Sequence, residues 1–136
     1  TTPSVVYFPA GTYIVSAAIK GYYYYTQLVG DPNNLPVIRA TPTFSGDSLI
    51  DGDPYSSLGI LSQAPDYIFY RQIRNFVIDM TQIPYDFPSA GINWPTGRTT
   101  SMQNVVFQMS QTPGTQHVGL KMEQGSAFLL QFGMVC

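Results

Sequence analysis

The sequence is short of charge and of long apolar runs. Charged residues make up 10% of the 136 residues, against roughly 25% in an average folded domain. With a formal net charge of −2 and no cluster of basic residues, the chain lacks the positive surface that nucleic-acid binding requires. No apolar run approaches the roughly 18 to 20 residues of a membrane-spanning helix, and the first residues do not form a signal peptide. Nucleic acid and membrane are therefore not expected as partners.

Residues that carry chemistry are equally scarce. Cys136 is the only cysteine, so neither an internal disulfide nor a cysteine metal site can form, and a bond beyond the chain or a free thiol both remain open. His117 and Glu123 are the only histidine and the only glutamate, and their separation along a strand places them about 20 Å apart. No nucleophile turn, phosphate loop or zinc pattern occurs. The residues alone predict no metal, no cofactor and no active site.

What the chain does contain is a repeated strand pattern. The segment Ile73–Thr81 recurs position by position as Met102–Ser110, and Gly91–Trp94 recurs as Gly119–Met122 at nearly the same spacing. Periods of roughly 20–50 residues are typical of solenoids, and β-branched and aromatic residues dominate both copies. The sequence therefore predicts an all-β, parallel β-helix of about four to five coils with this period.

Asparagine marks the expected bends of this helix. Asn75 and Asn104 stand at equivalent positions of the two copies, and asparagine tolerates a left-handed backbone better than other non-glycine residues. We expect the two amides to form a ladder from one coil to the next. Asp51 and Asp53 flank Gly52, but the spacing is that of a turn and lacks the donor series of a calcium loop.

Loops and ends complete the predicted domain. Residues 55–66 read as an insertion that projects from the stack, and residues 82–90 as a second loop. A strand begins close to the start of the chain, and the last residues are apolar, whereas a complete solenoid ends in polar caps. Residues 1–136 are therefore predicted to be a partial β-helix domain that is truncated at both ends and belongs to a longer protein.

Aromatic residues are the first candidates for ligand contact. The run Tyr22–Tyr25 could form a platform for sugar rings, because tyrosine combines an apolar face with a hydroxyl group. Packing into the core and stacking between coils is the alternative. Tyr24 and Trp94 are taken as the candidate substrate-binding aromatics.

Several segments resemble the amino-terminal β-helix of glycoside hydrolase family 55, the exo-β-1,3-glucanases. They are Val5–Tyr13, Tyr23–Asn34, Arg71–Thr81, Gly91–Trp94 and Ser101–Ser110. The likeness extends to about Ser126. It implies a secreted, extracellular enzyme with two right-handed β-helices of the pectate-lyase-like kind side by side. The enzyme would cleave laminarin-type β-1,3-glucan from the non-reducing end with inversion.

The resemblance also implies roles for single residues. Family members take their general acid from a glutamate in the second helix, which this chain does not contain, so the isolated chain is expected to be inactive. The first helix supplies a glutamine and a serine that position the attacking water, and the matching residues are Gln103 and Ser126. Glu123 is expected to be a turn residue. The partners implied are the glucan and the second β-helix. The alternative is a non-catalytic carbohydrate-binding or structural β-helix.

Overall fold

The computed structural model describes residues 4–21, 25–52, 70–95, 100–122 and 128–131. Within these ranges the chain forms eleven strands, and no helix that could cross a membrane is present there. The strands are β1 (Ser4–Phe8), β2 (Thr12–Val15), β3 (Ile19–Lys20), β4 (Thr26–Gly30), β5 (Val37–Ala40), β6 (Ser48–Asp51), β7 (Gln72–Asp79), β8 (Ser89–Asn93), β9 (Thr100–Gln108), β10 (His117–Lys121) and β11 (Phe128–Gln131).

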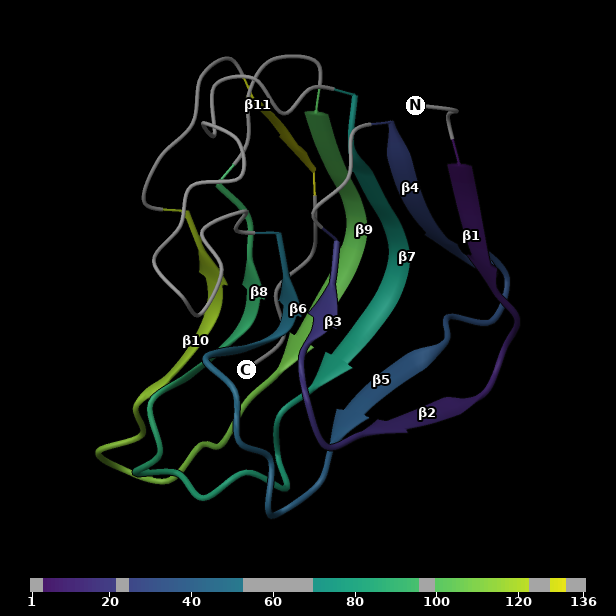
Figure 1. Cartoon of the computed structure of the whole chain (residues 1–136). Coiled ribbons are helices and arrows are strands. Elements are labelled where there is room, and N and C mark those ends of the chain that lie inside the picture. Colours follow the sequence, from purple (N-terminus) through teal and green to yellow (C-terminus); the bar gives the residue numbers. More distant parts are fainter. Residues whose placement is uncertain (1–3, 22–24, 53–69, 96–99, 123–127, 132–136) are drawn as a thin grey trace.

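Each coil runs through three faces, and every pairing between the described strands is parallel (Figure 1). The first face stacks β1, β4, the start of β7, the start of β9, and β11. The second face stacks β2, β5, the end of β7 and the end of β9. The third face is the separate sheet of β3, β6, β8 and β10. The predicted parallel β-helix is confirmed.

The repeated segments lie in register, as predicted. Ile73 pairs with Met102 on β7 and β9, and Ile92 pairs with Leu120 on the third face. The expectation that all coils share this period, however, is wrong for the earlier coils. The step from Ser4 to its partner Thr26 is shorter than the step between the two copies, and the step from Gln27 to Gln72 is longer. The connections vary in length while the strands keep their register.

The bend between the first two faces takes two forms. The first two coils turn through separate segments, residues 9–11 and 31–36, whereas β7 and β9 pass the bend as continuous strands. Asn75 and Asn104 sit at this bend with φ of 64° and 53°. The Nδ2 of Asn104 donates to Oδ1 of Asn75 at 3.0 Å, and the Nδ2 of Asn75 donates to the carbonyl of Gly30 at 3.1 Å. The predicted asparagine ladder is confirmed and extends one coil further.

Gly30 is the close approach that this ladder requires. A Cβ atom at Gly30 would overlap the carbonyl oxygen of Asn75 and would lie 2.6 Å from Cγ of Pro36. Only glycine lets the second coil come near enough for its carbonyl to accept the hydrogen bond from Asn75.

The core fills the space between the three faces. Phe107 packs against the backbone of the third face, where a Cβ at Gly91 would lie 2.7 Å from its ring. The largest fully buried apolar side chains come from successive coils: Ile38, Leu49, Ile50, Ile73, Phe76, Ile78, Met80, Ile92, Trp94 and Phe107. Stacking places side chains of one type above one another, so the core is continuous along the helix.

A buried arginine closes the corner between the third and first faces. Arg71 is 0% exposed. Its Nη1 donates to the carbonyl oxygens of Gly21 at 2.5 Å and Gly52 at 2.9 Å, and its Nη2 donates to that of Pro95 at 2.8 Å. The guanidinium also lies 4.2 Å from the ring centroid of Trp94. One side chain thus joins the backbones of three coils.

Asp79 anchors the end of β7. Its Oδ2 accepts from Nε of Arg39 at 2.7 Å, and its Oδ1 accepts from the backbone N–H and the hydroxyl of Thr81 at 2.9 and 2.6 Å. Burial alone would raise the pKa of Asp79, but the hydrogen bonds from Thr81 and the nearby Arg39 outweigh burial and hold this pKa below its ordinary value.

The asparagine bend predicts an ordered pair of destabilised variants. Asn75→Gly removes the two side-chain hydrogen bonds and should lower the free energy of unfolding by about 1–2 kcal/mol. Asn75→Ala should cost about 1 kcal/mol more, because alanine is strained at this positive φ. Urea denaturation checks both, with Asn33→Ala, an exposed asparagine in a turn, as the unaffected control. Equal stability of the Gly and Ala variants would contradict the strain argument.

The lowered pKa of Asp79 predicts acid-sensitive stability. A carboxylate with a folded-state pKa below its unfolded value stabilises the protein above the unfolded pKa, and this stabilisation is lost as the pH falls through the folded one. Asp79→Asn should therefore lower stability near pH 7 by about 1–3 kcal/mol, with the difference from wild type shrinking below about pH 4. Denaturation at several pH values measures this. Asp86→Asn, at an exposed carboxylate, is the control, and a pH-independent loss in Asp79→Asn would refute the assignment.

Candidate functional site

Gln103 lies on the outward side of the first face. Its neighbour Met102 is 0% exposed, and side chains alternate along a strand, so Gln103 points away from the core while remaining half-buried. Gln103 pairs with Arg74 on β7, and Arg74 pairs with Val29 on β4. Arg74 therefore occupies the place equivalent to Gln103 one coil away.

A second outward row lies two residues earlier on the same strands. Gln27, Gln72 and Ser101 pair in register across β4, β7 and β9, and all three are half-buried. Together with Arg74 and Gln103 they form a continuous surface, which we call the outer polar patch. Its five members come from three successive coils.

The chemistry of the outer polar patch is neutral apart from one guanidinium. Amide and hydroxyl side chains both donate and accept hydrogen bonds, as sugar hydroxyls and water do. The Nε of Arg74 is buried and makes no hydrogen bond to any described residue. The patch contains no carboxylate, so these five side chains can hold a polyhydroxy ligand or orient a water but cannot supply a general acid.

The structure describes only some of the other predicted site residues. Ser126 and Tyr24 lie outside the described residues, as do Glu123 and Asp53. Trp94 is 1% exposed and packs beneath Arg71. In this structure the Trp94 ring is not accessible for stacking on a sugar; it packs in the interior of the β-helix instead.

One tyrosine pair was not foreseen from the sequence. Tyr25, the last residue of the tyrosine run, stacks on Tyr70 from the next coil with centroids 5.1 Å apart and rings 12° from parallel. Both have positive φ, 55° and 59°, and are 37% and 48% exposed. Each tyrosine stands two residues before a glutamine, and these glutamines, Gln27 and Gln72, pair with each other in the sheet. This shared spacing is the sequence signal that could have revealed the tyrosine pair. For Tyr25 the stacking between coils is thus observed.

His117 has a structural role. Its Nδ1 accepts from the backbone N–H of Ser110 at 3.3 Å, and its Nε2 lies 3.0 Å from the carbonyl of Pro84, to which it donates in the matching tautomer. Asp51 accepts a hydrogen bond from Asn93 of the next coil at 3.3 Å. Among the described residues no group of histidine, cysteine, aspartate and glutamate could hold a metal ion.

Known proteins resemble the chain over nearly its whole length. The family model described as "Rhamnogalacturonase A/epimerase, pectate lyase-like" matches residues 1–134. A "Probable glucan endo-1,3-beta-glucosidase" of Arthroderma benhamiae is 44% identical over 93% of the chain and 14% of that protein. A "Glucan 1,3-beta-glucosidase" of Cochliobolus carbonum is 40% identical over 92% of the chain and 16% of its own length.

A third relative has a name of another kind. The "Non-secreted LysM effector LysM15" of Penicillium expansum is 40% identical over 91% of the chain and 9% of its own length. The chain therefore spans between 9 and 16% of the length of these three relatives.

Proposed function

Because the chain belongs to the rhamnogalacturonase A/epimerase, pectate lyase-like family, we propose that it is one part of a longer glycoside hydrolase that cleaves β-1,3-glucan. Two similar relatives bear glucan 1,3-β-glucosidase names. The observation that carries the proposal is the outer polar patch, whose amides and guanidinium suit sugar hydroxyls. The chain would supply one wall of the substrate cleft in an enzyme of the glycoside hydrolase family 55 type.

The proposed reaction proceeds from the non-reducing end with inversion. Inversion requires a general acid on one side of the sugar ring and a water on the other, with room for that water between the two groups. The acid lies outside this chain, on a second β-helix. Of the two relatives, one has "endo" in its name and the other does not, so exo action rests on the resemblance of the strand motifs.

Gln103 and Ser126 are proposed to position the attacking water. The Oε1 of Gln103 would accept a hydrogen bond from the water and Nε2 would donate one to a sugar hydroxyl. Both side chains are neutral, so they orient the water without competing for its proton. Arg74, one coil away, would hold the neighbouring part of the glucan. We further propose that the longer protein acts outside the cell, on polysaccharide.

The second candidate is a non-catalytic carbohydrate-binding or structural β-helix. It is favoured by the match to a protein named as an effector rather than as a glucosidase and by the exposed tyrosine pair at the coil edge. The two candidates differ in what the outer polar patch does: it either orients a reacting water or only binds glycan.

The isolated chain should not hydrolyse laminarin, because its patch lacks a general acid. Reducing-sugar release measured with this chain alone should equal the buffer blank, whereas the longer protein should release glucose. Circular dichroism establishes that the isolated chain is folded in this assay. Substantial glucose release by the folded chain would mean that the acid lies within these residues.

Substitution of Gln103 in the longer protein distinguishes the two candidates. Gln103→Ala should lower kcat by about 100-fold or more while glucan binding changes little, because misplacing a reacting group costs rate rather than affinity. Steady-state kinetics and isothermal titration calorimetry on laminari-oligosaccharides measure the two effects. Gln108→Ala is the matched control, an exposed glutamine on the same strand beyond the bend. An unchanged kcat in Gln103→Ala would favour the binding module.

A further inference from the structure

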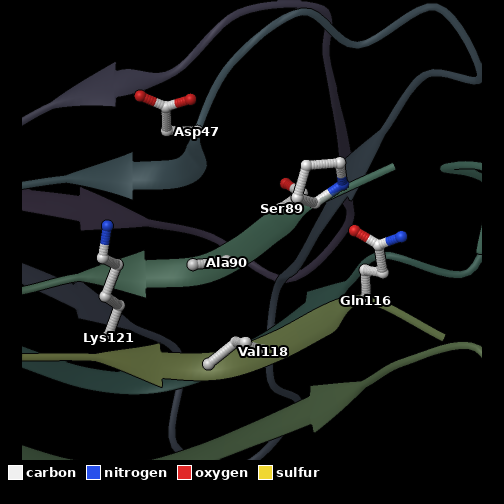
Figure 2. A pocket seen from close by; sticks show the side chains of 7 residues that line it. Asp47, Ser89, Ala90, Gln116, Val118 and Lys121 are labelled. Atoms are coloured by element: carbon white, nitrogen blue, oxygen red, sulfur yellow. The ribbon is translucent and has the colours of Figure 1, made fainter. Parts of the chain in front are cut away.

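A pocket of about 340 Å³ lies on the third face, away from the outer polar patch. It is lined by Asp47, Pro88, Ser89, Ala90, Gln116, Val118 and Lys121. Figure 2 shows Ala90 and Val118 on adjacent strands, with the polar side chains of Asp47, Gln116 and Lys121 around them. The volume falls within the range of roughly 300–1,000 Å³ that small-molecule sites occupy.

The rim of this pocket is fixed to the β-helix by backbone hydrogen bonds. The N–H of Ala90 donates to the carbonyl of Asp47 at 2.8 Å, which ties the segment before β6 to β8. The N–H of Gln116 donates to the carbonyl of Tyr85 at 2.7 Å, which ties the segment before β10 to the loop before β8. Three coils therefore hold the lining residues in place, as a preformed site requires.

The floor of the pocket is aliphatic. Ala90 pairs directly with Val118 in the sheet, and Val118 is 49% exposed. Pro88 extends this apolar surface at the start of β8. Such a floor suits a ligand with one flat C–H face, since contact there removes apolar surface from water.

The polar groups of the pocket come from Asp47, Gln116 and Lys121. The amide of Gln116 is exposed and can both donate and accept hydrogen bonds, as a sugar hydroxyl does. Asp47 and Lys121 carry opposite charges, which favours a neutral ligand over an anion or a cation.

We propose that this pocket is an accessory site for a single neutral pyranose unit of a β-glucan chain. The sugar's C–H face would lie on Val118 and Pro88, and its hydroxyls would bond the Asp47 carboxylate and the Gln116 amide. The choice of a glucan as the source of this pyranose rests on the proposed function. The site would hold polysaccharide on the third face while the outer polar patch engages the first face.

Binding of laminaritriose to the isotope-labelled chain tests the site by NMR. The amide signals of Ala90, Gln116 and Val118 should shift and saturate with increasing sugar. Asp47→Ala should weaken binding about tenfold or more, because hydrogen bonds to charged groups are among the stronger ones. Val118→Arg should abolish binding, because the arginine side chain would occupy the space above the floor of the pocket. Absence of saturable shifts at these residues would overturn the proposal.

Two further variants separate a binding defect from misfolding. Gln116→Ala should leave the unfolding midpoint unchanged, because its side chain is exposed, but should weaken laminaritriose binding about fivefold. Asp86→Ala removes an exposed carboxylate that does not line the pocket and should bind as wild type does. Wild-type affinity in both Asp47→Ala and Gln116→Ala would overturn the proposal.

The same measurements keep this site apart from the proposed hydrolase. Gln103→Ala should leave the pocket shifts unchanged, since Gln103 lies on another sheet. If the pocket variants bind normally while the longer protein hydrolyses laminarin, the accessory site fails and the hydrolase stands. If the longer protein is inactive on laminarin while laminaritriose shifts the pocket signals, the hydrolase fails and the site stands.

Discussion

The guanidinium of Arg71 is the interaction on which the stack of coils depends. In a β-helix the strands satisfy one another's backbone groups, but the corners leave carbonyl oxygens without a strand partner. Arg71 takes up three such oxygens, from Gly21, Gly52 and Pro95, which follow strands of three successive coils. Its planar fork, resting on the Trp94 ring, suits this arrangement, whereas the point charge of a lysine would not.

The position of Arg71 fixes the proposed functional surface. It immediately precedes β7, so it determines where that strand begins and which of its side chains face outward. Because β7 and β9 pair in parallel register, the same positions face outward on both strands, and Gln103 lies beside Arg74. The same corner also holds the third face, because Gly52 directly follows β6 and Pro95 lies just beyond the end of β8. Core, corner and both proposed binding surfaces are thus mechanically linked.

Much of this arrangement could be predicted from the sequence, because stacked coils repeat their own pattern. The copies that begin at Ile73 and Met102 identified the fold, the register and the asparagine bend. The burial of Trp94 could not be predicted, because it depends on Gly52 of another coil, where a Cβ atom would lie 2.5 Å from the ring. Nor could the unequal coils, since the first two carry no copy of the repeat. The pocket on the third face combines three segments of unrelated sequence, which no local pattern reveals.

The unequal coils have a consequence for how such a protein can change. Gln27 pairs with Gln72 across a long stretch of chain and Gln72 pairs with Ser101 across a much shorter one, yet the same row continues through both steps. Sequence length and spatial layer are therefore uncoupled: residues can be gained or lost at a corner without displacing the side chains presented along a face. The connecting loops can therefore vary while the stacked rows stay the same, and a loop could be exchanged between relatives without altering the rows.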